Sequence, residues 1–193
     1  MTGASQTGAR VLPFMPGGAA ADAALVSGRV VLADLTGLPR MGLKGKGSAD
    51  WLAGRGLTLP AVNHVAHQDG LKILRLGRED ILLTGEDDPD GLAAIADAWH
   101  ADAGPKGYWS WREEGWAWMR ISGPGADDAM RRLCALDLRP GGHLPADVLA
   151  QTRVGHVEAV ALRSAAGYDV LFDITVSAFF ARAVEAAAAG QSA

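Results

Sequence analysis

A short glycine-rich segment is the first part of this sequence whose residue types could do chemistry. Gly45-Lys46-Gly47-Ser48 combines a flexible backbone with a cation and a hydroxyl, and such a segment at a helix N-terminus can bind phosphate. A phosphate-binding loop, however, needs glycine, lysine and a hydroxyl residue in direct succession, and Gly47 separates the last two. The segment therefore favours a structural turn between a strand and a helix.

Two histidines and an aspartate form the second group. His64, His67 and Asp69 carry imidazole and carboxylate groups, which are the usual ligands of hydrolytic zinc sites. The surrounding residues 62–70 do not follow a helical pattern that would place these side chains on one face. We expect a solvated loop that binds no metal.

The single cysteine is the third candidate. Cys134 could act as a nucleophile only if a histidine such as His143 or His156 lay beside it in the folded chain. Its spacing from Ala126 and Met130 places it on the apolar face of a helix. We therefore expect a small buried hydrophobic side chain.

Four of the six tryptophans fall within residues 109–118, where we predict a β-hairpin with its turn at Arg112–Gly115. In this hairpin Trp111 faces Trp116 and Trp109 faces Trp118, which gives two cross-strand aromatic pairs. Tryptophan and arginine commonly anchor protein interfaces, although such pairs could also stack on a flat heterocycle. The candidate interface residues are Trp109, Trp111, Arg112, Trp116 and Trp118.

The other motifs of self-sufficient enzymes are missing from the sequence. It contains no Gly-x-Ser-x-Gly, no Gly-x-Gly-x-x-Gly, no Ser-His-Asp order and no paired cysteines. We accordingly assign no catalytic, cofactor-binding or metal-binding residue to this chain.

Composition and charge exclude several classes of protein. Hydrophobic residues make up 49% and charged residues 21% of the 193 residues, which is typical of a folded globular chain. The net charge of −4 leaves no excess of cations for nucleic-acid phosphates. A lone cysteine forms no disulfide within one chain, and we find neither a signal peptide nor a membrane-spanning run. These features predict a cytoplasmic protein that contacts neither nucleic acid nor membrane.

The chain divides into an arm, two halves and a tail. Residues 1–28 are rich in Gly, Ala and Ser, and we predict a flexible arm there. Residues 29–104 and 105–189 form the two halves, packed as one domain, and residues 190–193 form a tail. Strands are expected over 29–35 and 38–44, and a last helix over 177–188. The side chains expected to face inward from that helix are Phe179, Phe180, Ala183, Val184 and Ala187.

An internal repeat underlies this division. Residues 41–52 align with 119–130 at an offset of 78, with Met, two glycines and an aspartate in common. Residues 80–84 align with 169–173 at an offset of 89. The repeat predicts an α+β fold made of two pseudo-repeated β-α-β-β-α halves.

The same segments carry a resemblance to a known family. Asp-Leu-Thr-Gly-Leu-Pro-Arg-Met-Gly-Leu-Lys-Gly at 34–45, together with 120–126, 133–138, 150–154 and 168–173, resembles the gamma subunit of heterotetrameric sarcosine oxidase. The small subunit of N-methylglutamate dehydrogenase is similar. The resemblance implies a fold like the folate-binding domain of aminomethyltransferases.

The resemblance also implies a function for the chain. It predicts a non-catalytic gamma subunit in a complex that oxidises sarcosine, or a related N-methyl amine, and passes the one-carbon unit to tetrahydrofolate. The partners would be alpha, beta and delta subunits, chiefly alpha. FAD, FMN, NAD, tetrahydrofolate and zinc would lie on those subunits, with no cofactor on this chain. A stand-alone folate-binding protein and a free aminomethyltransferase are the alternatives.

Overall fold

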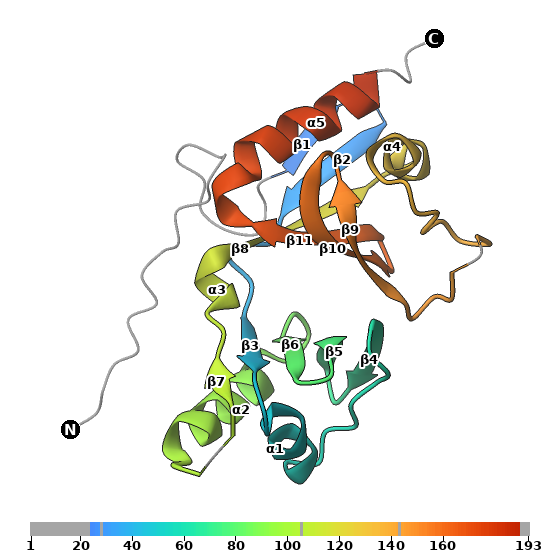
Figure 1. The fold of residues 1–193 in the computed structure, drawn as a ribbon. Helices are drawn as coiled ribbons and strands as arrows, with labels where there is room; N and C mark the ends of the chain where they lie inside the picture. Colours follow the sequence, from blue (N-terminus) through green and yellow to red (C-terminus); the bar gives the residue numbers. More distant parts are fainter. Residues whose placement is uncertain (1–23, 28, 105, 143, 190–193) are drawn as a thin grey trace.

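The computed structural model describes residues 24–27, 29–104, 106–142 and 144–189. They form two antiparallel sheets, and Figure 1 shows helices α4 and α5 beside one sheet and α1 and α2 beside the other. A mixed helix and strand architecture was predicted from the sequence, and this part of the prediction is confirmed.

Sheet A has the strand order β1-β2-β8-β11-β10-β9. Its outer face is covered by α4 (Ala126–Leu133) and α5 (Ser177–Ala189), and the short helix η1 (Ile174–Val176) leads into α5. The strands are β1 (Ala24–Ser27), β2 (Val30–Asp34), β8 (Trp116–Ser122), β9 (Leu149–Val154), β10 (Val157–Ser164) and β11 (Gly167–Asp173).

Sheet B has the order β4-β5-β6-β3-β7. Its outer face is covered by α1 (Ser48–Gly54) and α2 (Pro89–Ala101), and α3 (Arg112–Gly115) links β7 to β8. The strands are β3 (Arg40–Lys44), β4 (His64–Gln68), β5 (Leu71–Gly77), β6 (Asp80–Thr84) and β7 (Tyr108–Trp109).

The inner faces of the two sheets pack against each other. Side chains alternate across a strand, so Leu71 and Ile73 face the helices of sheet B while Leu74 and Leu76 face sheet A. In sheet A, Trp118 and Leu171 point inward to meet them, and Trp118 is only 1% exposed. The result is a four-layer arrangement of helices, sheet B, sheet A and helices.

Both sheets contain a hairpin with a two-residue turn in the left-handed region. Asp69 and Gly70 connect β4 to β5 with φ of 51° and 77°, and Gly155 and His156 connect β9 to β10 with φ of 56° and 67°. Turns of this kind match the twist of the flanking strands. The expectation of a solvated loop over 62–70 is therefore wrong for β4, because the Asp-Gly turn pairs these residues with β5.

Each half contains three strands after its first helix rather than the two of the predicted β-α-β-β-α unit.

The junction between strand and helix is also alike in the two halves. Gly45 follows β3 with φ of 93°, and Gly123 follows β8 with φ of 91°, which fits the offset of 78. Lys44 pairs with Asp80, however, whereas Ser122 pairs with Gly167. Asp80 thus corresponds to Gly167 in the ladders, and the sequence alignment of Asp80 with Asp169 is shifted by two positions. A shift of two keeps side chains on the same face, which explains why the apolar pattern alone permits it.

The halves exchange strands. β2 precedes β3 in the chain but pairs with β8 in sheet A, and β7 precedes β8 but pairs with β3 in sheet B. The division at 104/105 therefore does not separate the sheets. The arm predicted for 1–28 also ends earlier than expected, because β1 already pairs with β2. Residues 1–23 and the tail at 190–193 lie outside the described residues.

The last helix occupies the predicted residues. Phe180, Val184 and Ala187 are buried against sheet A, as expected from their spacing. Phe179 was predicted to face inward, but it is 45% exposed. Neighbouring helix positions point about 100° apart, so Phe180 and Phe179 cannot both point at the sheet.

Gly167 gives a test of the sheet A geometry. Its φ is 148°, and a Cβ there would lie 2.2 Å from the Ile121 carbonyl oxygen on β8. We expect Gly167→Ala to lower the free energy of unfolding by about 2–3 kcal/mol, since neither the backbone nor its neighbour can move cheaply. Gly37 has no atom within 4 Å of such a Cβ, so Gly37→Ala is the control and should change little. Equal urea midpoints for the two variants would contradict this geometry.

Candidate functional site

Four charged side chains meet between the two sheets. Lys72 of β5 and Glu86, which follows β6, come from sheet B, while Arg120 of β8 and Asp169 of β11 come from sheet A. Arg120 donates Nε to Asp169 at 2.6 Å and both terminal nitrogens to Glu86 at 2.8 and 2.9 Å. Lys72 Nζ lies 3.1 Å from Asp169 and 3.6 Å from Glu86. We call these four residues the inter-sheet charge network.

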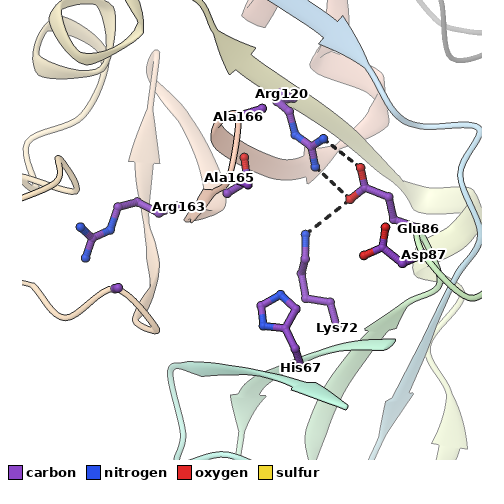
Figure 2. A pocket seen from close by; sticks show the side chains of 10 residues that line it. His67, Lys72, Glu86, Asp87, Arg120, Arg163, Ala165 and Ala166 are labelled. Atoms are coloured by element: carbon purple, nitrogen blue, oxygen red, sulfur yellow. Dashed lines mark hydrogen bonds and ion pairs between the residues drawn. The ribbon is translucent and has the colours of Figure 1, made fainter. Parts of the chain in front are cut away.

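The network opens on one side into a cavity of about 520 Å³. Figure 2 shows Arg120, Glu86 and Lys72 joined by dashed lines, with His67 near Lys72. The cavity lies at the junction of the two halves, since β5 and β8 both contribute to it. The charged and polar residues that line it are His67, Lys72, Glu86, Asp87, Arg120, Arg163 and Ser164.

The electrostatics of the network favour the ionised forms. The hydrogen bond from Arg120 lowers the pKa of Glu86, with the charges of Arg120 and Lys72 adding to the shift against the opposing effect of burial. Burial acts against the charge of Arg120, but the hydrogen bonds with Asp169 and Glu86 outweigh it and raise the pKa of the guanidinium. A carboxylate with a lowered pKa is a weak base, so Glu86 is poorly suited to accept a proton from a substrate. Two cations and two carboxylates instead neutralise each other and join the sheets.

The lowered pKa of Glu86 predicts a pH dependence of stability. A carboxyl whose pKa is depressed by folding stabilises the protein above its unfolded pKa, near 4.5, and loses this contribution as the pH falls through the folded pKa. We expect the wild type to be more stable than Glu86→Gln at neutral pH, with the gap closing below pH 4.5. Urea unfolding of both proteins across this range measures the gap. A gap that stays constant would show that the ionisation of Glu86 contributes nothing.

The predicted tryptophan hairpin is not formed. Arg112–Gly115 closes into a helical turn, with the Gly115 N–H donated to the Trp111 carbonyl, and the segments on either side enter different sheets. Trp118 lies in the core, and Arg112 is 8% exposed and forms two hydrogen bonds with Asp80. These two residues are therefore not surface contacts, which corrects the predicted interface.

The remaining tryptophans of this segment lie closer to the surface. Trp111 is 64% exposed and has a φ of 52°, an unusual conformation for a bulky residue. Trp109 is partly buried, packs beside His100 and Trp111 and donates its indole N–H to Glu113. Trp116 is partly buried, and the Arg112 guanidinium lies 4.5 Å from its ring centroid. Whether Trp109, Trp111 and Trp116 contact a partner stays a prediction.

The glycine-rich segment forms a turn before a short helix. The Ser48 hydroxyl donates a hydrogen bond to the Gly45 carbonyl at 2.7 Å, and Ser48 itself is fully buried. Lys46 is exposed. The hydroxyl thus closes the turn, in agreement with the structural interpretation of this segment.

The histidine group and the cysteine belong to different elements, since His64 and His67 lie on a strand of sheet B and Cys134 follows helix α4. His64 and His67 belong to β4, and Asp69 lies in the turn that follows. Within the part of the chain that the structure describes, no three His, Cys, Asp or Glu side chains are placed to hold a metal ion. Cys134 is buried, as predicted, and burial raises the pKa of its thiol. His143 lies outside the described residues.

Sequence reasoning missed the inter-sheet charge network. Each of three members lies between two apolar residues of a strand, as in Leu71-Lys72-Ile73, Met119-Arg120-Ile121 and Tyr168-Asp169-Val170. Alternation places such a charge on the opposite face from its neighbours. A charged residue between two apolar ones was therefore a signal in the sequence. It indicates a buried charge only if both faces of the sheet are known to be covered.

The described helices are too short or too polar to cross a membrane. This statement covers residues 24–27, 29–104, 106–142 and 144–189 alone.

No family model matches the chain, and no curated protein matches it by sequence. A chain in the structure of heterotetrameric sarcosine oxidase from Corynebacterium sp. U-96, in complex with pyrrole 2-carboxylate, superposes with a TM-score of 0.68 at 21% identity. The match covers 88% of this chain and 89% of that one, so the two are similar in length.

The second similar structure is the glycine cleavage system aminomethyltransferase T from Bartonella henselae. It matches with a TM-score of 0.57 at 14% identity and covers 82% of this chain but 46% of the aminomethyltransferase. At these identities the likeness concerns the fold. This chain therefore has a fold shared with a chain of heterotetrameric sarcosine oxidase and with part of an aminomethyltransferase, as the sequence resemblance implied.

Proposed function

We propose that this chain is a non-catalytic gamma-type subunit of a heterotetrameric sarcosine-oxidase-like complex. The observation that carries the proposal is the near-complete match in both directions with a chain of a heterotetrameric sarcosine oxidase. The aminomethyltransferase, by contrast, is covered to less than half. The pairing of all four charges in the inter-sheet network supports the same interpretation, because these groups serve the packing of the sheets.

In this proposal the cytoplasmic complex oxidises sarcosine or a related N-methyl amine and transfers the one-carbon unit to tetrahydrofolate. The alpha, beta and delta subunits carry FAD, FMN, NAD, tetrahydrofolate and zinc, and this chain docks chiefly on alpha. A complex of the N-methylglutamate dehydrogenase type is the alternative within the same class. The substrate used by the purified complex separates the two.

We further infer that the two halves are copies of one unit. Their elements follow in the same order, β3-α1-β4-β5-β6-α2 and β8-α4-β9-β10-β11-α5. The strand orders β4-β5-β6-β3 and β9-β10-β11-β8 correspond as well. The similar turns at Asp69-Gly70 and Gly155-His156 support this origin, because turn type is set locally by each copy.

Co-purification from the native host tests the proposed function. An affinity tag on the full chain should retain three further subunits together with flavin absorbance and sarcosine-dependent reduction of an electron acceptor. The isolated chain should show neither flavin absorbance nor this activity. Recovery of the tagged chain alone, under mild salt and at native expression, would contradict the proposal.

A stand-alone folate-binding protein is the second candidate, favoured by the fold shared with an aminomethyltransferase. Calorimetry with tetrahydrofolate distinguishes it from a docking subunit. Tight binding by the isolated chain, with no companion subunit recovered, would support this candidate over the first.

A further inference from the structure

A groove runs along the outer side of sheet A between two helices. It has a volume of about 650 Å³, and it is lined by α4 and the residue Ala135 beyond it, by α5, and by the end of the β9-β10 hairpin. Figure 1 shows α4 and α5 on the face of sheet A that points away from sheet B. We call it the α4–α5 groove.

The inside of the groove is apolar. Phe179 is 45% exposed there although it is a large hydrophobic side chain, and Leu133 is half-buried beside Gly155. Ala183 and Ala186 lie on the same side of α5, one and two turns after Phe179, and their small side chains leave room for an incoming group. An exposed aromatic next to a row of alanines is a surface suited to packing against another chain.

The rim of the groove is basic. Arg132 comes from α4, Arg182 from α5, and Arg153 and His156 from the hairpin, while none of the Asp and Glu residues that the structure describes lines the groove. This is a local excess of cations on a chain with a net charge of −4. An approaching carboxylate therefore meets an attractive field at this face and a repulsive one over the molecule as a whole.

Two arginines of the rim, Arg153 and Arg182, can take a new partner at low cost. Arg153 forms an ion pair with Glu158, but the two side chains are 75% and 74% exposed, and such pairs contribute little to stability. Arg182 forms no hydrogen bond or ion pair with any other residue that the structure describes. The turn at Gly155 and His156 holds the Arg153 end of the hairpin against Ala183, since a Cβ on Gly155 would lie 3.2 Å from that side chain.

We propose that the α4–α5 groove docks an acidic amphipathic segment of the large partner subunit. Its apolar side chains cover Phe179 and the alanines of α5, and its carboxylates pair with Arg182 and Arg153. In a two-fold symmetric dimer a second copy of this chain would bring a like-charged rim to the same place, which disfavours this form of self-association. This inference rests on the proposed function, because the partner it names is another subunit of that complex.

Charge reversal in the assembled complex tests the inference. The tagged full chain carrying Arg153→Glu and Arg182→Glu should retain about tenfold less of the large subunit than the wild type. Arg131→Glu is the matched control, because Arg131 is an exposed arginine of α4 that lies outside the groove. Thermal unfolding of each purified variant checks that the surface changes leave the fold intact. Equal retention by the double variant and the control would overturn the inference.

Cross-linking identifies the occupant. A photoreactive phenylalanine analogue at position 179, introduced into the tagged full chain, should cross-link to a peptide of the large subunit that is rich in Asp and Glu. A cross-link to a second copy of this chain, or none in an intact complex, would overturn the inference while leaving the proposed function standing. If the wild type retains no flavin-containing partner at all, both the proposed function and this inference fail.

Discussion

Replacing Asp169 by alanine is expected to lower the free energy of unfolding by about 3–5 kcal/mol. Asp169 is 1% exposed and accepts hydrogen bonds from Arg120 and Lys72, which come from opposite sheets. Its removal leaves two cations close together at the inter-sheet face with Glu86 as their remaining carboxylate. The cost of leaving a buried charge without its partner exceeds the net contribution of the intact pair. Chemical denaturation at neutral pH, followed by circular dichroism, measures the change.

An exposed ion pair gives the matched control for this prediction. Glu158 pairs with Arg153 at 2.5 Å, but both side chains are about three-quarters exposed. We expect Glu158→Ala to change the free energy of unfolding by less than about 1 kcal/mol. Similar losses in the two variants would show that the inter-sheet charge network is no more important than a surface pair. A smaller loss in an Asp169→Ala, Arg120→Met double variant would support the charge explanation directly.

Arg40→Met is expected to be the second strongly destabilising change, by about 3 kcal/mol. Arg40 is 4% exposed, and its guanidinium donates hydrogen bonds to backbone carbonyls of two separate segments. One segment contains Thr36 and the other contains Glu113 of α3. Methionine preserves most of the aliphatic volume but removes every donor. The carbonyls that accept from Arg40 would then lose these donors, and they belong to Thr36, Leu38, Arg112, Glu113 and Trp116.

The loss of Arg40 should destabilise the structure around α3 more than the rest of the fold. Three of these carbonyls lie in or beside α3, so amide hydrogen exchange should accelerate first at residues 112–116. Arg78→Met is the control, because Arg78 is exposed on a turn of sheet B. Unchanged exchange at α3 in Arg40→Met would mean that the short helix is held by other contacts, such as the hydrogen bonds between Arg112 and Asp80.

Much of the fold could be predicted from periodicity. The helix at α4 shows an apolar face and the last helix ends where its pattern ends, because both lie on one side of a sheet. The strand β3 and Gly45 after it were also predicted from a local pattern, in which a glycine follows a short extended segment. Each of these elements is specified by residues close to one another in the chain.

The errors arise where pairing is decided by distant residues. The alternation of tryptophans around Arg112–Gly115 suits a hairpin. In the structure, however, the segment before the turn pairs with β3 and the segment after it pairs with β11, so the two segments do not pair with each other. For β4 the local signal was strong and was missed, since Asp69-Gly70 between extended runs is typical of a two-residue hairpin. The shift of the second alignment by two positions likewise becomes visible only in the strand ladders.

The candidate site was the least predictable part. Lys72, Glu86, Arg120 and Asp169 are far apart in the sequence and match no short motif. They meet because two sheets pack face to face, which no window of a single strand can reveal. The basic rim of the α4–α5 groove is hidden in the same way, because its arginines come from two helices and from strand β9.

The exchanged strands have a consequence for how the chain is made. β2 leaves the ribosome early, but its partner β8 is synthesised more than eighty residues later. During this interval β2 has only β1 as a partner, and the edge of β2 that later pairs with β8 stays open for several seconds at elongation rates of about 5–20 residues per second. Sheet B differs, because four of its five strands are synthesised by Thr84 and only the two-residue edge strand β7 follows later. The centre of sheet A can therefore form only after β8 has been synthesised, and until then the open edge of β2 favours aggregation.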